Sequence, residues 1–263
     1  MQGALYHNKR QYKRQSQTTL LNAVLSTLNT IHKGQIKAQI SQFKTPNFSG
    51  IDSLRFITTK AFLKRFTTKF SLNLESKKLN TQREIYANLG ERCEVSTTKA
   101  LKLTKQITIM AFYTHDTITK SRKSKDRLDN YAILSIHGLQ QYDHEIKEPL
   151  SHNPKTAQIL KYLLRYCNQS KERKQISLKS FDYALDYLES ATISKQYALS
   201  KNEHLGAIAH AKFRQCKTTL YIQNQDSQKP LLNTLRKIKI YDKTHKNDLK
   251  FLLIRAELLY KID

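Results

Sequence analysis

The segment "KIKIYDKTHKNDLKFLLIRAELLYK", residues 237–261, constrains the fold more than any other part of the chain. Two runs of alternating character flank the polar stretch "THKNDLK", whose length is typical of an antiparallel hairpin. Side chains of a strand alternate between its faces, so the two isoleucines of "KIKIY" are expected to point into a core. Tyr241 is then expected on the polar face, opposite Arg255 or Leu253 of the second strand.

The polar face of this hairpin is cationic. On the first strand the same parity groups Tyr241 with Lys237, Lys239 and Lys243. On the second strand Arg255 and Glu257 share a face. Two interpretations stay open at this point: an ordinary solvated strand face that carries one tyrosine, or a nucleophile with its electrostatic supports.

A second unusual strand is "FDYALDY", residues 181–187. Alternation places Asp182 and Asp186 on one face of an otherwise apolar run, although aspartate is disfavoured in strands. A divalent cation held by the carboxylates would explain this pattern. Two acids on the wet side of a half-buried strand would explain it equally well.

Further periodic segments define the fold class. Strand-like alternation is found in residues 34–43, 50–58, 105–114, 130–139, 176–188 and 217–225. Helical spacing of apolar residues is found in residues 16–33, 59–74, 81–93 and 156–167. We therefore expect an α+β protein with a largely antiparallel sheet and helices packed on it. Residues 1–150 are expected to form a basic N-terminal region that is also part of the sheet, and residues 151–263 a region that holds the tyrosine and acidic motifs.

Charge indicates the partner. The chain has 46 Lys and Arg against 21 Asp and Glu, a net charge of +25, and Asp52 is the only acidic residue among residues 1–60. Such an excess is typical of proteins that bind a polyanion, and no amphipathic helix suited to a membrane surface is found. Nucleic acid is therefore the expected partner. A polar stretch, residues 119–130, is expected to contact its phosphates through Arg122, Lys123, Lys125 and Arg127.

Other classes are disfavoured. Three dispersed cysteines argue against a disulfide framework or a cysteine-based zinc site, and they suit a reducing cytoplasm. The N-terminus has no apolar signal region, and no apolar run is long enough to span a membrane. No GxxxxGK[ST] motif occurs, so helicase activity is not expected to be intrinsic.

The motifs "SFDYALDY", "TTLYIQNQDS", "KIKIYDKTHK" and "LIRAELLYK", in this order, resemble the replication initiation factor family. These are initiators of rolling-circle plasmids, of some filamentous phages and of conjugative elements. The match covers about residues 176–261. The resemblance implies a replication-initiator-like catalytic region at residues 151–263 and a DNA-binding role for residues 1–150. It also implies a cytoplasmic enzyme that nicks and rejoins origin DNA through a 5′-phosphotyrosine.

The resemblance also implies roles for individual residues. Tyr241 would be the nucleophile, and Tyr260 is expected to pack inward by its strand parity. Lysines beside Tyr241 would favour the phenolate and hold the phosphate. The acidic side chains would bind Mg²⁺ or Mn²⁺ to polarise the phosphate. The expected metal ligands are Asp182, Asp186 and Glu257, with Glu257 also catalytic, and the expected DNA contacts are Lys237, Lys239, Lys243, Arg255 and Tyr221.

Two alternatives to a replication initiator stay open. A conjugative relaxase would use the same chemistry, and a non-catalytic basic DNA-binding regulator would keep the fold without the reaction. An initiator would work with a host helicase and polymerase, and a homodimer is left open.

Overall fold

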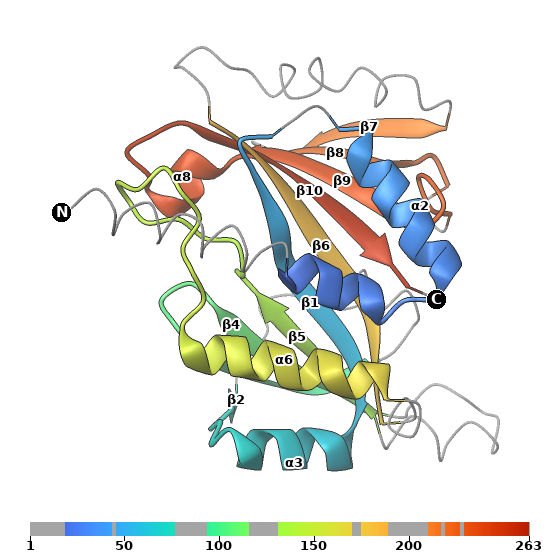
Figure 1. Cartoon of the computed structure of the whole chain (residues 1–263), viewed down its shortest axis with the longest axis vertical. Coiled ribbons are helices and arrows are strands. Elements are labelled where there is room, and N and C mark those ends of the chain that lie inside the picture. Colours follow the sequence, from blue (N-terminus) through green and yellow to red (C-terminus); the bar gives the residue numbers. More distant parts are fainter. Residues whose placement is uncertain are drawn as a thin grey trace. The chain divides into compact units, whose positions relative to one another are not determined.

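The computed structural model describes residues 19–43, 46–76, 94–115, 131–169, 175–188, 210–216, 219–226 and 229–262. The fold class is α+β, with a largely antiparallel sheet and helices packed on it, as predicted (Figure 1). The chain divides into two compact units, which interleave along the sequence. The first unit comprises residues 1–52, 140–152 and 180–263, and the second comprises residues 53–139 and 153–179. These units differ from the two regions expected on either side of residue 150.

The first unit contains four whole strands and most of a fifth, β6, in the order β6-β10-β9-β8-β7, each antiparallel to the next. They are β6 (Ile176–Leu188), β7 (Ala211–Cys216), β8 (Thr219–Asn224), β9 (Leu235–Asp242) and β10 (Leu253–Lys261). The short helix α8 (Lys243–Asn247) lies between β9 and β10. The predicted hairpin is therefore present, with a helical turn inside its loop.

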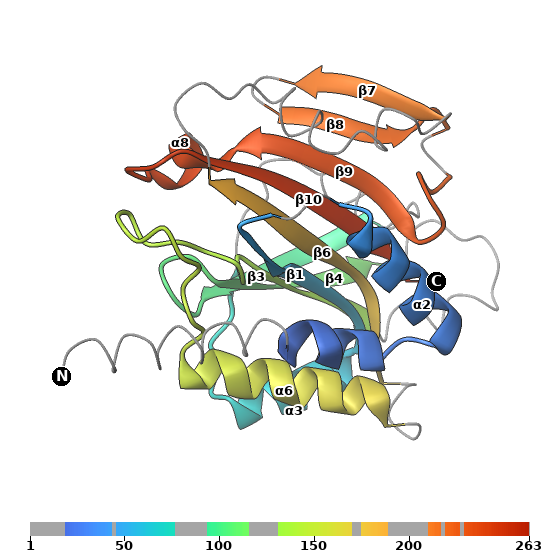
Figure 2. The same ribbon diagram turned by 45° about the horizontal axis from the view of Figure 1, so that its top comes forward.

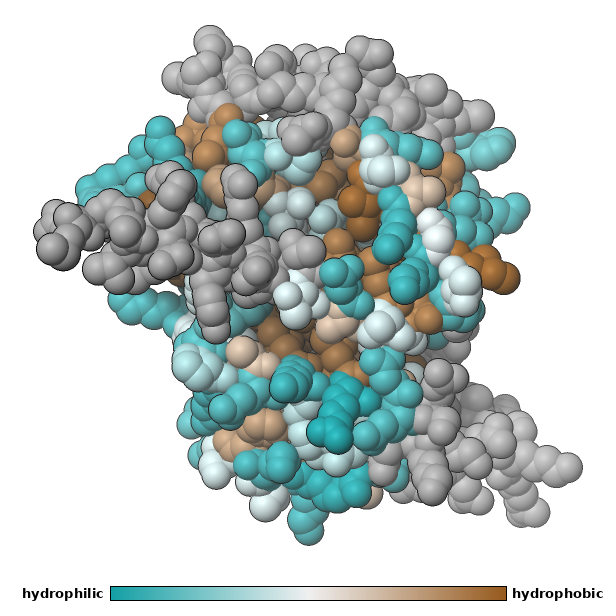
Figure 3. Space-filling model, in the orientation of Figure 1, coloured by the Kyte–Doolittle hydropathy of each residue, from teal (hydrophilic) through white to brown (hydrophobic). Residues whose placement is uncertain are grey.

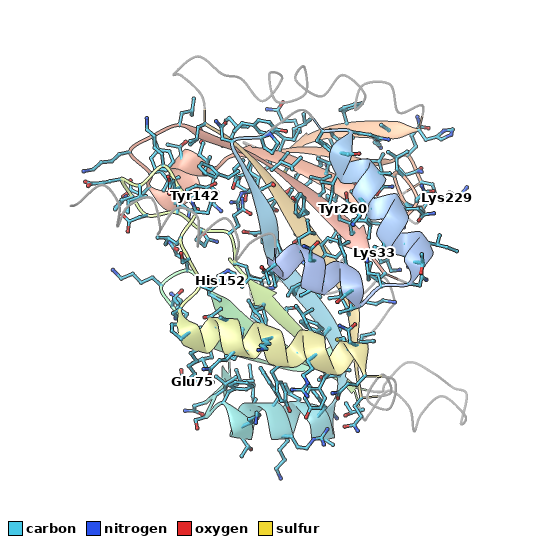
Figure 4. All side chains as sticks on the ribbon, in the orientation of Figure 1. Lys33, Glu75, Tyr142, His152, Lys229 and Tyr260 are labelled. Carbon is cyan, nitrogen blue, oxygen red and sulfur yellow. The ribbon has the colours of Figure 1, made fainter. Side chains whose placement is uncertain are left out.

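One face of this sheet is apolar and is covered by helix α2 (Thr30–Ser41), as Figures 1 and 2 show. The face carries five fully buried residues, Ile238, Ile240, Ala256, Leu258 and Tyr260. Gln39 of α2 donates Nε2 to the carbonyl of Leu232, 3.0 Å away, which ties the helix to the end of β9. The inward orientation expected for Tyr260 is confirmed, since its ring stacks on Phe181 at 4.9 Å (Figure 4).

The second unit contains β2 (Glu75–Ser76), β3 (Glu94–Lys102), β4 (Thr108–His115), β5 (Tyr131–His137) and most of β1 (Phe48–Thr59). Neighbours in the order β2-β3-β4-β5-β1 are antiparallel. Phe56, Leu134 and Ala111 lie side by side across three of these strands and are fully buried. Helices α3 (Lys60–Lys69) and α6 (Pro154–Asn168) complete the unit.

Local sequence explains both helices. The side chain of Thr59 caps the N-terminus of α3, and that of Asn153 caps α6, with Pro154 in the first turn. Phe62, Leu63 and Phe66 of α3 follow the helical spacing and are buried. The predicted helices over residues 59–74 and 156–167 are thus confirmed, although α3 ends at Lys69.

The strand predicted over residues 34–43 is wrong, because residues 34–41 belong to helix α2. Their apparent alternation also contains the helical spacing of Ile36 and Gln39, which are the buried residues of this helix. Asn29 supplies a cap by accepting a hydrogen bond from the backbone N–H of His32, at 2.8 Å. The helix-capping residue Asn29, which precedes residues 34–43, therefore favours a helix rather than a strand there.

Among the described helices, none has the length and apolar character needed to cross a membrane. Polar residues dominate the view of the surface in Figure 3, with apolar areas mainly near α2 and the sheet. The predicted helix over residues 81–93 and the basic stretch with Arg122, Lys123, Lys125 and Arg127 lie outside the described residues.

Candidate active site

The register of the first unit's sheet aligns polar side chains into three rows on the face opposite α2. Across β6, β10, β9 and β8 the rows are Asp186–Arg255–Tyr241–Thr219, Ala184–Glu257–Lys239–Tyr221 and Asp182–Leu259–Lys237–Gln223. Residues directly opposite each other on neighbouring strands point to the same face. Tyr241 therefore lies opposite Arg255, one of the two positions predicted from the sequence, and next to Glu257 on the diagonal.

Tyr241 is 8% exposed and donates its hydroxyl to Oε1 of Glu257 at 2.5 Å. The other oxygen of Glu257, Oε2, lies 3.4 Å from Nζ of Lys239. Glu257 itself is 7% exposed. The phenol thus has a hydrogen-bonded carboxylate beside it, and that carboxylate is paired with a lysine.

Burial raises the pKa of Tyr241 well above its ordinary value, and the charge of Glu257 raises this pKa further. Arg255 lowers this pKa, but its charge does not offset burial and the charge of Glu257, so the phenol form of Tyr241 is favoured. The expected effect of the neighbouring lysines on the phenolate stays a prediction. A phenolate at Tyr241 requires transfer of its proton, and Glu257 is the acceptor in place.

Arg255 occupies the centre of the cluster and is fully buried. Its Nε and Nη2 donate to the two carboxylate oxygens of Asp186, at 2.6 and 2.7 Å. Its Nη1 donates to Oδ1 of Asp52 at 2.7 Å, and its Nη2 also donates to the carbonyl of Gln140 at 2.8 Å. The guanidinium fork is thereby held from two strands and one loop. Burial alone would lower the pKa of Arg255, but the charges of Asp186 and Asp52 raise it overall.

Asp186 is saturated by these contacts and by two more. Its Oδ2 also accepts from Nε2 of Gln140 at 2.5 Å and from the hydroxyl of Tyr142 at 2.7 Å. Both carboxylate oxygens are directed at donors in the protein interior. This geometry disagrees with the expected metal-binding role of Asp186, because its oxygens are already held by a cation and two neutral donors. Arg255, expected at a DNA contact, is likewise enclosed.

Lys243 was expected on the strand face with Tyr241, but it is the first residue of α8. Asp242 starts this helix by accepting a hydrogen bond from the N–H of Thr244 at 2.8 Å, so strand parity ends there. Lys243 is 2% exposed and donates Nζ to the carbonyl of Gln140 at 3.0 Å. Its ammonium also lies 5.9 Å from the ring centre of Tyr142, which Figure 4 shows beside α8. Lys243 therefore supports the interior of the site.

Burial lowers the pKa of Lys243 from 10.5 to about 8, and the charge of Arg255 acts in the same direction. Asp52, Asp186 and Glu257 oppose this shift. The pKa of Lys237 is also lowered, first by burial and then by the charges of Lys239 and Arg214. Both lysines are thus easier to deprotonate than a surface lysine.

The second and third rows meet at β8 and β9, where aromatic and cationic groups lie together. Nζ of Lys237 lies 4.3 Å from the ring centre of Tyr221, a cation–π contact. Lys237, Lys239 and Tyr221 are all half-buried, so this part of the face is more accessible than Tyr241. It is the described part of the site best suited to hold a phosphate.

The fit of a divalent cation depends on Asp182 and Glu257, which are 4% and 7% exposed. No group of three His, Cys, Asp or Glu side chains suited to a metal ion occurs among the described residues. Mg²⁺ is commonly held by only one or two carboxylates together with substrate phosphates. The donor set therefore suits a cation that arrives with a phosphate, and the metal stays a proposal.

Sequence analysis missed three members of the cluster: Asp52, Gln140 and Tyr142. Asp52 did carry a signal, as the only acid in the first 60 residues, at a position within a predicted strand. Gln140 and Tyr142 carried none, since they belong to a loop that approaches the site only through the fold.

Comparisons with known proteins add little. No family model matches the chain, and no curated protein matches its sequence. Among solved structures, the rolling circle replication initiator protein from Geobacillus stearothermophilus aligns over 82% of this chain and 74% of that chain, at 10% identity and a TM-score of 0.37. An acyl-CoA hydrolase from Agrobacterium tumefaciens aligns over 84% of this chain and 98% of that chain, at 9% identity and a TM-score of 0.12. Neither similarity is close enough to support an argument about function.

Arg255 provides a test of the cluster's contribution to stability. We expect Arg255→Met to lower the free energy of unfolding by about 3–5 kcal/mol, because it leaves buried carboxylates without their cation. Urea unfolding followed by circular dichroism measures this loss. In the control Lys250→Met, the exposed pair of Lys250 with Glu145 is removed, at an expected cost below about 1 kcal/mol. Equal losses in the two variants would contradict the central role of Arg255.

The lowered pKa of Lys243 predicts that the stability of the protein depends on pH. Its pKa is about 8 in the folded protein and 10.5 ordinarily, so between these values the unfolded chain binds a proton that the folded protein has released. Stability therefore rises with pH in this window. Relative to Lys243→Met, we expect the wild type to gain about 3 kcal/mol from below pH 8 to above pH 10.5. Urea unfolding of both proteins at a series of pH values gives the difference between their free energies of unfolding. A difference that stays flat or falls with rising pH would show that the pKa of Lys243 is not lowered in the folded protein.

Proposed function

We propose that this protein nicks and rejoins single-stranded DNA through a covalent link to Tyr241, as a rolling-circle replication initiator. The observation that carries the proposal is the hydrogen bond from the Tyr241 hydroxyl to Glu257 at 2.5 Å. A hydroxyl nucleophile next to a general base is the arrangement that covalent catalysis requires. The resemblance of the four C-terminal motifs to replication initiators supports the same reaction.

The proposed step transfers a phosphoryl group from one oxygen to another. The Tyr241 oxygen forms a bond to phosphorus while its proton passes to Glu257, and the bond between phosphorus and the 3′ oxygen breaks. The leaving 3′ oxygen takes up a proton and becomes a free 3′-hydroxyl. The 5′ end stays on Tyr241 as a phosphotyrosine, whose energy is retained for the reverse, rejoining step.

Nearby groups would assist this step. Lys239 lies 3.4 Å from Glu257 and Lys237 lies against Tyr221, so both can approach the negative phosphate from the accessible side of the row. Asp182 would hold Mg²⁺ or Mn²⁺ together with the phosphate while Glu257 acts as the base, and such an ion neutralises charge on the phosphate. The free 3′-hydroxyl would be used by a host polymerase with a host helicase, in the cytoplasm.

The non-catalytic alternative is favoured by one observation. Tyr241 is only 8% exposed, and its pKa is raised, as expected for a structural tyrosine. A regulator that binds DNA through its basic surface would need no reactive phenol. A covalent adduct separates the two functions, and a conjugative relaxase would form the same adduct.

The decisive variant is Tyr241→Phe, which removes the hydroxyl and keeps the ring. We expect it to bind a labelled single-stranded origin oligonucleotide like the wild type but to form no SDS-resistant adduct with Mn²⁺. Mass spectrometry of the wild-type adduct should place the nucleotide on Tyr241. The matched control Tyr221→Phe is expected to keep the adduct. An adduct of full strength in Tyr241→Phe would assign the nucleophile elsewhere.

The metal proposal is tested at Asp182. We expect Asp182→Asn to weaken Mn²⁺ binding at least tenfold in the presence of the oligonucleotide, measured by electron paramagnetic resonance, and to abolish nicking. DNA binding should persist, because the phosphate contacts come from lysines. Asp226→Asn, a change at an exposed aspartate, is the control. Unchanged Mn²⁺ binding and nicking in Asp182→Asn would remove Asp182 from the metal site.

A further inference from the structure

The second unit has a cavity of its own, of about 420 Å³, between helices α3 and α6. Its volume falls within the range of about 300–1,000 Å³ that is typical of small-molecule sites. The side chains that line it are Lys69, Phe70, Gln158, Lys161, Tyr162, Arg165, Tyr166 and Gln169. In Figure 3 an apolar area lies between the hydrophilic residues of these two helices. None of these residues belongs to the Tyr241 site.

Aromatic rings form the floor of this cavity. Tyr162 contacts Tyr166 at 4.5 Å and Phe70 at 5.3 Å between ring centres. Behind them, Phe62 and Phe66 are fully buried and contact Tyr162 at 6.2 Å each. The inner rings hold the helices together, while the three outer rings are only half-buried. The cavity therefore presents ring surface that is fixed by a packed core beneath it.

Cations surround these rings. Lys69, Lys161 and Arg165 line the cavity and are exposed, and its lining contains no Asp or Glu. Nζ of Lys69 lies 5.5 Å from the ring centre of Tyr162, so cation and ring share one surface. Gln158 and Gln169 add amide donors and acceptors at the rim. The cavity thus combines positive charge, flat rings and amide groups.

We propose that this cavity binds one nucleotide unit of single-stranded nucleic acid. The base would stack against the outer rings, and its flanking phosphates would contact Lys69, Lys161 and Arg165. Aromatic rings beside cations form the general surface on which single strands bind, because each base has a flat face and each nucleotide a negative charge. A duplex does not suit the cavity, since its bases are already stacked on one another.

A single strand is favoured over a free nucleotide by charge. Three cations around one cavity exceed what a single monophosphate requires, whereas a strand brings a phosphate on each side of the bound base. The net charge of +25 also favours a polyanion. The inference is independent of the chemistry at Tyr241, because it concerns other residues of another unit.

The test is photo-cross-linking of an oligothymidylate of about ten nucleotides that carries 5-iodouracil, with peptide mapping by mass spectrometry. We expect cross-links on Tyr162 or Tyr166. The triple variant Lys69→Ala, Lys161→Ala, Arg165→Ala should reduce them at least tenfold. It should also lower the salt slope of binding, measured by anisotropy, by about 2, at about 0.7 per lost contact. The control variant changes Lys60, Lys64 and Lys155 to Ala, exposed lysines of the same helices outside the cavity, and should retain the cross-link.

Stacking has its own pair of variants, chosen to keep the helices folded. Tyr166→Phe keeps the ring and should keep the cross-link to Tyr162, whereas Tyr166→Leu should weaken oligonucleotide binding at least about fivefold. Equal effects of the two variants, with both folded by circular dichroism, would overturn the stacking role. Absence of any cross-link on α3 or α6 in the wild type would overturn the site.

Competition distinguishes the sources of the ligand. We expect the oligonucleotide to bind at least tenfold more tightly than dTMP, and dTMP more tightly than inorganic phosphate. Equal binding of dTMP and oligonucleotide would overturn the single-strand assignment, and equal binding of phosphate and dTMP would overturn recognition of the base. All measurements are repeated with Tyr241→Phe. An α3–α6 cross-link that persists there supports this inference whether or not Tyr241 is a nucleophile.

Discussion

The buried charge of Arg255 is the constraint on which the rest of the first unit depends. A guanidinium with no exposed surface is costly to remove from water, so it is tolerated only where hydrogen bonds and opposite charges surround it. Asp186 supplies two of these contacts, Asp52 one, and the carbonyl of Gln140 another. Each partner comes from a different segment, so one cation fixes the positions of β1, β6, β10 and the loop at Gln140. Tyr241 is held in place because it lies directly opposite this arginine.

Burial also determines how Tyr241 can react. A phenol shielded from water keeps its proton, and the raised pKa of Tyr241 expresses that preference. In the proposed reaction a base must therefore accept the proton, and Glu257, 2.5 Å from the hydroxyl, is the group placed to do so. Lys239 moderates the negative charge of Glu257, which limits how strongly the carboxylate opposes an incoming phosphate. In the proposed reaction, this arrangement would keep the phenol protonated until the phosphate and an accompanying cation reach the site.

Strand periodicity predicted this part of the site because it is a local property. The alternation around Tyr241 and the acids of β6 correctly grouped the side chains that share a face, and the short loop set their register within one residue pair. The prediction failed where a local signal changed the conformation: Asp242 caps a helix, so Lys243 turns inward. Gln140 and Asp52 could not be found by periodicity, since they lie 115 and 203 residues from Arg255 in the sequence. Only tertiary structure brings such residues together.

The charges of the cluster place a demand on any phosphate that enters it. Arg255, Lys243 and Lys239 face Asp52, Asp186 and Glu257, so the cations and carboxylates balance before substrate arrives. A phosphodiester adds a negative charge to a region with little water, and in such surroundings an unbalanced charge is strongly disfavoured. The compensation has to come from outside the balanced set. Lys237 at the accessible end of the face and a divalent cation bound with the phosphate are the two sources that the geometry allows, and both would act only when substrate is present. Under the proposed function, a site balanced in this way would separate binding by the wider basic surface from reaction, which would begin only once the added cation and the phosphate arrive together.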